Sequence, residues 1–177
     1  MDSTHTISEA RDTDIPTIVD LLNRSYRGES SRLGWTTEAD LIGGDVRTDI
    51  DDVTRTFERR GSVFLLCRSP EGETVGCVNL QLRGDRLYLG MFAVRPILQG
   101  HGIGSGLMRA AEHHALQTGC QAIFMWVISG RIELIDWYAR LGYRDTGERV
   151  PFEEDGLSGP HLRTLEFMVL EKKLGKA

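Results

Sequence analysis

The chain has 177 residues, 40% of them hydrophobic, and a formal net charge of -5 at pH 7. A general nucleic-acid binder usually presents a basic face, so the acidic balance argues against that class. No apolar run approaches the roughly 20 residues that span a bilayer, and the first twenty residues are too polar for a signal peptide. We expect a globular cytoplasmic protein with no nucleic-acid or membrane partner.

The cysteines and histidines point to neither a disulfide nor a metal site. Cys67, Cys77 and Cys120 are odd in number, widely spaced and without a C-x-x-C pair, so we expect reduced thiols that act as small hydrophobic side chains. His113 and His114 are adjacent in a predicted helix and therefore about 100° apart, a poor geometry for binding one ion together. We predict no metal.

The first sixty residues predict a short strand followed by helices. The strand lies within residues 4–10, and the helix after it begins with capping-type residues and Pro16. Its apolar residues recur at helical spacing, at Ile15, Ile18, Val19, Leu22 and Tyr26. The polar, glycine-rich segment 28–49 is expected to be a loop with a short helix near Thr37–Leu41, and a further helix is expected around Ile50–Arg59.

Three strands are predicted next, as an antiparallel meander. "SVFLLC" from Ser62 is a buried strand, and "SPEGE" is a turn. In "TVGCVNLQL", from Thr74, apolar and polar residues alternate, with Asn79 and Gln81 on the polar face, as in a half-buried strand. "RGDR" then turns into "LYLGMFAV", so the last two strands are most simply a hairpin.

The second half alternates strands and helices. A helix follows Ile103 and is ended by Gly119, and "AIFMWVIS" from Ala122 is a continuous apolar strand. "RIELIDWYARLGY" is a helix stopped by Gly142, and "RTLEFMVLEKKL" is the last strand. With no repeats and no linker, residues 1–177 are expected to form a single domain with a mixed α+β sheet.

A glycine-rich loop separates the hairpin from the helix that follows it. The segment "VRPILQGHGIGSGLM" from Val94 to Met108 holds glycines at every second position, Gly100, Gly102, Gly104 and Gly106. A helix start offers N–H groups without internal partners, and glycines let a large anion approach them. The loop is therefore either a phosphate cradle or a turn that lets a strand and a helix pack closely.

Two common phosphate-binding patterns do not fit this loop. The Walker pattern would need G-K-[ST] where the chain has Gly-Ser-Gly. The Rossmann pattern would place its third glycine at Ser105 or Leu107. A third pattern fits in full, a strand ending in V-x-P followed by Gln-x-x-Gly-x-Gly, here Val94–Pro96 and Gln99–Gly104.

On these residues the chain resembles the GNAT superfamily of acetyl-CoA-dependent N-acetyltransferases. "DWYARLGY" is similar to a second motif of that family and places Tyr138 at its recurrent tyrosine. The resemblance implies a mixed, mostly antiparallel central sheet of six to seven strands flanked by about four helices. It also implies a splayed strand pair, "LYLGMFAV" and "AIFMWVIS", that holds acetyl-CoA.

The resemblance assigns the acetyl-CoA contacts residue by residue. Backbone groups of Phe92, Ala93 and Val94 would bind the pantetheine arm like another strand. Amides of the loop would hold the pyrophosphate, contributed by Gln99, Gly100, His101, Gly102, Ile103, Gly104 and Ser105. The His101 side chain is either an added contact or incidental.

The resemblance also implies the catalytic roles. A strand N–H near Phe92 would stabilise the thioester oxygen, and Tyr138 would donate a proton or hydrogen bond to the departing sulfur. The alternative for Tyr138 is a core tyrosine with its hydroxyl at the rim. Many relatives carry a glutamate where this chain has Gly90, which could instead serve a strand bulge. The base would then be an ordered water or a carboxylate, with Glu29, Glu38 and Asp40 as candidates.

The substrate-selecting segments carry weaker indications. Trp35 is expected to wall a pocket or to anchor its loop, and Glu29 and Glu38 are candidate substrate contacts or surface carboxylates. The acidic flap "VPFEEDGLSGPH" from Val150, with Glu153, Glu154 and Asp155, is expected either to attract a cation or to be a solvated turn. Arg131 stands where relatives often have Asn, and would contact a CoA phosphate, an acidic substrate group or only solvent.

The predicted function is therefore acetyl transfer from acetyl-CoA to a primary amine of a small molecule. Two alternatives stay open, a protein or peptide N-acetyltransferase and a non-catalytic acyl-CoA-binding sensor, the latter because Gly90 cannot act as a base. The resemblance suggests a homodimer, because relatives are often dimers, and the sequence itself does not give the oligomeric state.

Overall fold

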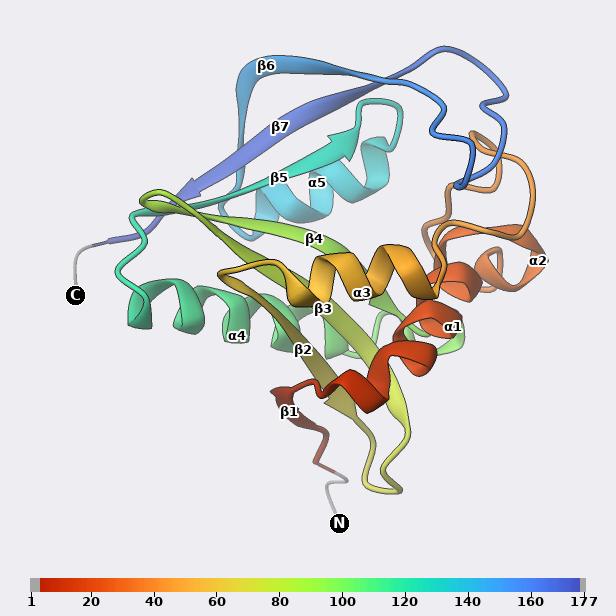
Figure 1. Cartoon of the computed structure of the whole chain (residues 1–177). Coiled ribbons are helices and arrows are strands. Elements are labelled where there is room, and N and C mark those ends of the chain that lie inside the picture. Colours follow the sequence, from red (N-terminus) through yellow and green to blue (C-terminus); the bar gives the residue numbers. More distant parts are fainter. Residues whose placement is uncertain (1–3, 176–177) are drawn as a thin grey trace.

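A seven-stranded mixed sheet in the order β1-β2-β3-β4-β5-β7-β6 runs through the molecule (Figure 1). The computed structural model describes residues 4–175. Neighbouring strands are antiparallel except β4 and β5, which are parallel. The strands are β1 Thr6–Glu9, β2 Ser62–Arg68, β3 Thr74–Arg83, β4 Arg86–Val94, β5 Ala122–Ile128, β6 Arg144–Phe152 and β7 Leu165–Lys173.

Helices cover both faces of the sheet, which confirms the predicted α+β class. The α-helices are α1 Ile15–Tyr26, α2 Gly28–Ser31, α3 Ile50–Glu58, α4 Ile103–Gln117 and α5 Ile132–Arg140. One apolar core joins α1 and α3 to one face, and a second joins α4 and α5 to the other. The three cysteines are buried and free. Among residues 4–175, no helix is both long and apolar enough to cross a membrane.

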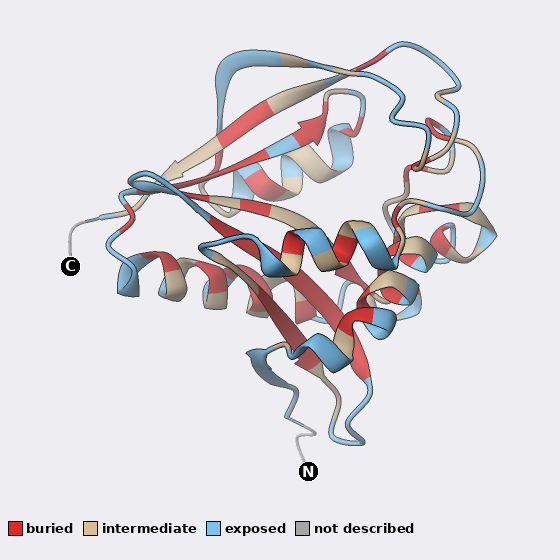
Figure 2. Ribbon diagram, viewed as in Figure 1, coloured by how far each residue is buried: buried red, intermediate tan, exposed pale blue. Residues whose placement is uncertain are grey.

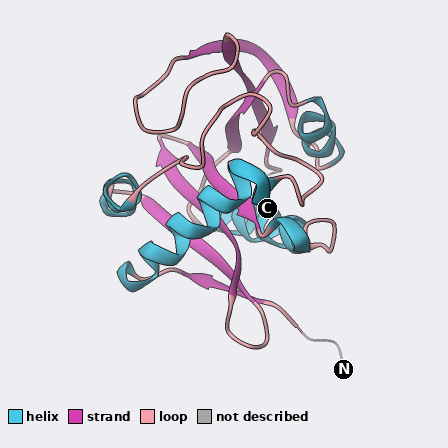
Figure 3. Ribbon diagram, turned by 90° about the vertical axis from the view of Figure 1, so that its right-hand side faces the viewer, coloured by secondary structure: helices cyan, strands magenta, loops and turns pink. Residues whose placement is uncertain are grey.

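The predicted short helix near Thr37–Leu41 is wrong. These residues form turns, because the N–H groups of both Leu41 and Ile42 close on the carbonyl of Glu38 and the chain then leaves the turn to bridge His161. The short helix of this segment is α2 instead. Residues 32–49 and 153–164 consequently lie side by side at one end of the molecule (Figures 1 and 3).

The expectation that β3 is half-buried is also wrong. Residues 74–81 are buried on both faces (Figure 2). The alternation is real, but the polar face lies on the side of the sheet that α1 and α3 cover, so Asn79 and Gln81 are only 1% and 6% exposed. Their amides bond each other, and Asn79 also donates to Ser62 and to the Val63 carbonyl, which compensates their burial.

Strand β6 was not predicted, and the acidic flap is shorter than expected. β6 is an edge strand that is mostly exposed and includes Pro151, so it carries no apolar alternation to reveal it. It takes up Val150, Pro151 and Phe152, and the flap begins at Glu153.

Strands β4 and β5 separate after three residue pairs. They pair from Arg86 with Ala122 to Tyr88 with Phe124, and beyond that point each continues without the other. The splayed strand pair expected from the sequence is therefore present. It opens a gap in the middle of the sheet, beside the start of α4.

A bulge in β4 accompanies this separation. Asn79 of β3 pairs with Gly90 and Cys77 pairs with Ala93, so two β4 residues stand opposite one. The bulge lies directly after Gly90, the position suggested for it from the sequence, and its left-handed conformation falls on Met91, with φ 43°. Gly90 has a different steric role, since a Cβ there would lie 2.9 Å from the Tyr88 ring.

Candidate active site

Two cavities meet in the gap between β4 and β5. The loop-side cavity, about 270 Å³, is bounded by the glycine loop, the end of β4 and α5. The sheet-side cavity, about 210 Å³, is bounded by β4, β5 and the segments around Glu38 and Asp155. We call the residues that line both cavities the junction: Tyr26, Phe92, Arg131, Leu134 and Tyr138.

The glycine loop presents a run of free donors to the loop-side cavity. Within the described residues, the N–H groups from Gly100 to Ser105 donate no hydrogen bond to the protein. Gly100 and Gly102 have φ of 83° and 84°, and a Cβ on either would meet no atom within 4 Å. The positive end of the 15-residue helix α4 adds to these donors. The loop therefore fits a pyrophosphate.

The end of β4 turns an unpaired edge toward the same cavity. The Arg95 N–H donates to Val75 on β3, so by strand alternation Phe92 and Val94 direct their backbone groups to the open edge. Tyr26 donates to the Phe92 carbonyl, and Ser25 donates to the Val94 carbonyl. The N–H groups of Phe92 and Val94 are left facing the gap.

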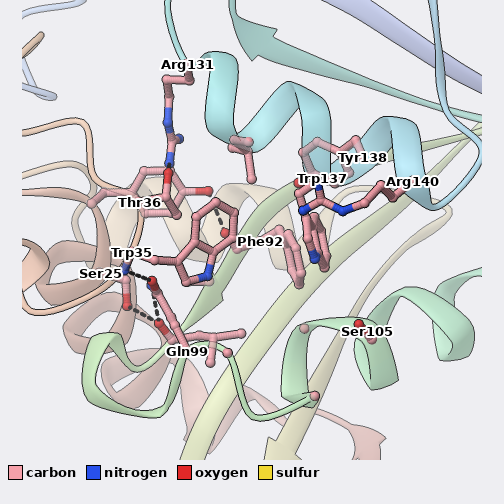
Figure 4. Close-up of a pocket in the computed structure, with 17 residues that line it drawn as sticks. Ser25, Trp35, Thr36, Phe92, Gln99, Ser105, Arg131, Trp137, Tyr138 and Arg140 are labelled. Atoms are coloured by element: carbon pink, nitrogen blue, oxygen red, sulfur yellow. Dashed lines mark hydrogen bonds between the residues drawn. The ribbon is translucent and has the colours of Figure 1, made fainter.

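Aromatic rings form the wall opposite the glycine loop (Figure 4). Trp137 stacks on Phe92 with ring centroids 6.0 Å apart, and Trp35 lies 6.4 Å from Trp137. A Cβ on Gly104 would lie 3.4 Å from the Phe92 ring, so the first turn of α4 lies directly beside this wall. Gln99 links the two sides, because its side chain accepts from the backbone N–H of Trp35 and donates to the Val94 carbonyl.

Tyr138 lies at the junction with a protonated hydroxyl. It is 4% exposed and packs among Phe92, Trp137 and Tyr143. Burial raises its pKa well above 10, so the phenol is neutral at pH 7. Its hydroxyl makes no hydrogen bond to any other residue in the described part of the chain. The oxygen is therefore available to a ligand as a donor.

Glu38 is a buried carboxylate held by two arginines. It is 7% exposed and pairs with Arg27 and, at 3.0 Å, with Arg131. Burial alone would raise the pKa of Glu38, but the guanidinium groups of Arg131 and Arg27 outweigh burial and lower it. Arg27 also donates to the Ser158 carbonyl and so ties the flap to this ion pair. An ionised, doubly paired carboxylate is a poor proton acceptor.

The structure brings together most of the residues singled out from the sequence, but not all. Trp35 lines the loop-side cavity and Glu38 the sheet-side cavity. Glu29 and Asp40 lie apart from both, each in an exposed ion pair with Arg32. The backbone groups of Phe92, Ala93 and Val94 and most of the glycine loop line the loop-side cavity. The His101 ring lies against the Leu98 and Gln99 carbonyls.

Several lining residues were not singled out from the sequence. Ser25, Arg47 and Trp126 belong to no motif, and Tyr26 was identified only as a position on the apolar stripe of α1. Trp137 could have been found, because it precedes Tyr138 in the second motif. In residues 4–175 no group of three His, Cys, Asp or Glu side chains could hold a metal.

Comparisons with known proteins agree with this geometry. The sequence matches the family described as "Acetyltransferase (GNAT) family" over residues 15–143. An aminoglycoside N(6')-acetyltransferase type 1 from Stenotrophomonas maltophilia is 28% identical over 134 residues, covering 68% of this chain and 80% of that protein. A thialysine N-epsilon-acetyltransferase from Sus scrofa is 30% identical over 82 residues, covering 46% of this chain and 48% of that protein.

Solved structures share the fold over nearly the whole chain. The ribosomal-protein-S18-alanine N-acetyltransferase from Escherichia coli superposes with a TM-score of 0.73 at 15% identity, covering 98% of this chain and 96% of that one. The yncA protein from Salmonella typhimurium, solved with its cofactor acetyl-CoA, gives 0.71 at 20% identity and covers 99% and 96%. At these identities the likeness shows the fold alone.

Proposed function

The chain belongs to the acetyltransferase (GNAT) family, and on that premise we propose that it transfers an acetyl group from acetyl-CoA to a primary amine of a small molecule. The observation that carries the proposal is the junction. One cavity offers free backbone donors for a pyrophosphate, the other is open to a second substrate, and both reach Tyr138 and Phe92. The acetyltransferases similar to this chain are named for amine acceptors, and yncA was solved with acetyl-CoA, which supports the two substrates.

The residues at the junction suit a direct transfer. The amine nitrogen attacks the thioester carbonyl carbon, the carbon–sulfur bond breaks, and the nitrogen loses a proton while the sulfur gains one. The Phe92 N–H is the donor to the carbonyl oxygen as it becomes negative. The neutral phenol of Tyr138 is the donor to the departing sulfur.

The proton of the amine is assigned to water in the sheet-side cavity. Gly90 has no side chain to accept it, and Glu38 is already bound by Arg27 and Arg131. A small acceptor fits this cavity of about 210 Å³, which is lined in part by Asp155 and Ser158 of the flap that Arg27 holds.

The test is a turnover assay with acetyl-CoA and a panel of amines, in which the release of the free CoA thiol is measured. The proposal predicts thiol release that depends on the amine, and thermal stabilisation of the protein by CoA alone. Stabilisation without turnover of any amine would indicate an acyl-CoA sensor. Turnover restricted to peptide N-termini would indicate a protein N-acetyltransferase, and absence of CoA binding would remove the proposal altogether.

A further inference from the structure

Arginines without acidic partners surround the outer part of the sheet-side cavity. A third cavity of about 240 Å³ continues from it, and the two share Arg47, Tyr88, Gly90, Met91 and Trp126. Arg59 and Arg83 also line this outer cavity. No Asp or Glu is among the described residues that line it, although the whole chain carries a net charge of -5.

Of the three arginines that line the outer cavity, only Arg47 also lines the sheet-side cavity. Its guanidinium lies over the Tyr26 ring, 4.6 Å from the centroid, and Tyr26 itself lines the junction. It forms no ion pair with any carboxylate among residues 4–175. Burial raises the pKa of Tyr26 and of Tyr88, and in both cases the Arg47 charge is the largest opposing influence. Arg47 lines both the sheet-side and the outer cavity, so its positive charge is within reach of a ligand there.

Arg59 and Arg83, which line the outer cavity with Arg47, both bind the neutral side chain of Gln81. Both donate to the side-chain oxygen of Gln81, at 3.0 and 2.8 Å. Gln81 is fixed by its own bond to Asn79, so it holds the two guanidinium groups without neutralising them. Neither arginine forms an ion pair within the described part of the chain. Two further positive charges are thus left for a ligand.

The carboxylates that line the sheet-side cavity are already engaged. Glu38 is held by two arginines, and Asp155 accepts from the N–H groups of Leu157 and Ser158 and from the Ser158 hydroxyl. Asp52 accepts from the Thr48 hydroxyl. In the outer cavity, a polycationic amine would meet Arg47, Arg59 and Arg83, with no carboxylate in the lining to offset their repulsion.

We propose that the acceptor is a primary amine that also carries a carboxylate, bound by Arg47 with Arg59 and Arg83 behind it. This proposal rests on the proposed function, because it places the amine at the junction. Since Arg47 stacks on a junction residue, one small molecule such as an α-amino acid can reach both points. The rings of Tyr88 and Trp126, which also line the cavity, favour an apolar or aromatic side chain.

The test compares each amino acid with its decarboxylated amine. The pairs are L-phenylalanine with 2-phenylethylamine, L-tryptophan with tryptamine, and L-methionine with 3-(methylthio)propylamine, and spermidine represents polycations. We expect kcat/KM to favour the carboxylate-bearing member of at least one pair. Arg47→Gln should raise KM for that amino acid between about tenfold and a hundredfold, as for a lost hydrogen bond to a charged group. The same substitution should leave the KM for the decarboxylated amine nearly unchanged.

A charge reversal and a distant control make the test specific. Arg47→Glu should reverse the preference toward the decarboxylated amine. Arg24→Gln removes an exposed arginine on α1 that pairs with Asp20 and lines neither cavity, so it should change nothing. Stabilisation by CoA should be the same in all three variants, which shows that the donor site and the fold are intact.

The two proposals can fail separately. If decarboxylated amines or spermidine are acetylated more efficiently than every amino acid, and Arg47→Gln has no effect on KM, the anion site is wrong while the acetyltransferase stands. If no amine is acetylated, the same pairs are titrated by calorimetry into the protein with CoA. Binding of an amino acid that is lost in Arg47→Gln then supports the anion site, and no binding of any amino acid overturns it.

Discussion

The hydroxyl of Tyr26 donates a hydrogen bond of 2.5 Å to the carbonyl of Phe92. The bond ties the last residue of α1 to the open edge of β4, at the point where the ladder to β5 has ended. Tyr26, 66 residues away in sequence, thus satisfies a carbonyl that a neighbouring strand would otherwise bind.

Tyr26→Phe tests this link. It leaves a polar carbonyl with one partner fewer at the junction, which should cost about 1 kcal/mol in the free energy of unfolding. Because the neighbouring Phe92 N–H would be less firmly held, kcat should fall by about tenfold. Urea unfolding and steady-state kinetics measure the two effects, and an unchanged kcat would show that the edge needs no anchor there.

Tyr138→Phe tests the proton donor. The ring and its contacts with Phe92 and Trp137 remain, so the protein should stay folded and bind CoA as before. Loss of the phenol hydroxyl should lower kcat by between about tenfold and a thousandfold, the range of general-acid effects. Thiol release and CoA thermal shift are measured together. A variant with full kcat would remove Tyr138 from the reaction.

Gly102→Glu tests the glycine loop. The residue has φ +84° and opens onto the loop-side cavity, so a carboxylate there should block and repel a pyrophosphate and abolish stabilisation by CoA. Gly72→Glu is the matched control, because Gly72 has φ +86° in the turn before β3 and lines neither cavity. Both variants carry the same backbone strain. Only Gly102→Glu should lose stabilisation by CoA. A loss in both variants would mean that backbone strain, and not the carboxylate in the loop, prevents CoA binding.

Glu38→Gln tests the buried ion pair. It leaves Arg27 and Arg131 buried without their carboxylate, which should cost about 3–5 kcal/mol in stability. Glu73→Gln, which breaks an exposed pair with Arg95, should cost at most about 1 kcal/mol. Equal losses of unfolding free energy in the two variants, measured by urea unfolding, would show that the buried pair stabilises the protein no more than the exposed one.

The same pair predicts a pH dependence of stability. The pKa of Glu38 is lowered from its ordinary 4.5 in the folded protein. Its contribution is therefore fully present above about pH 4.5 and is lost as the pH falls through the lower folded value. The difference in unfolding free energy between wild type and Glu38→Gln should shrink in that acidic window and stay constant from pH 6 to 8, as followed by urea unfolding at each pH.

The assignment of the amine proton to water predicts the pH–rate profile. Without a carboxylate base, log kcat/KM should rise with pH until it reaches the pKa of the acceptor amine itself, with no inflection near a carboxyl value. Two acceptors whose amine pKa values differ should give profiles displaced by that difference. An inflection common to all acceptors would reveal a protein base.

What the sequence could predict depended on local patterns. Apolar spacing and helix-ending glycines located α1, α4 and α5, and the glycine loop and Tyr138 stood in motifs. β6 escaped because an exposed edge strand has no core-facing pattern. The polar face of β3 looked solvent-exposed because nothing local shows that helices cover that side of the sheet.

The acceptor side could not be predicted for the same reason. Arg47 lies in a polar loop, Arg59 ends a helix and Arg83 ends a strand, and only the tertiary fold brings them to one cavity. Glu38 could be identified as a candidate carboxylate, but its two partners come from residues 27 and 131. Sequence alone therefore left open whether the acceptor is attracted by acidic or by basic groups.

The extra residue at Met91 changes the phase of β4. Before it, the odd-numbered Leu87 and Leu89 face the core beneath α4, and after it the even-numbered Phe92 and Val94 face that core. Removing one residue here would exchange the two faces at the end of the strand, moving Phe92 and Val94 away from the core beneath α4 and Ala93 away from the core beneath α1 and α3. A single deletion at this point should therefore destroy the acetyl-transfer site and the packing of α4 together.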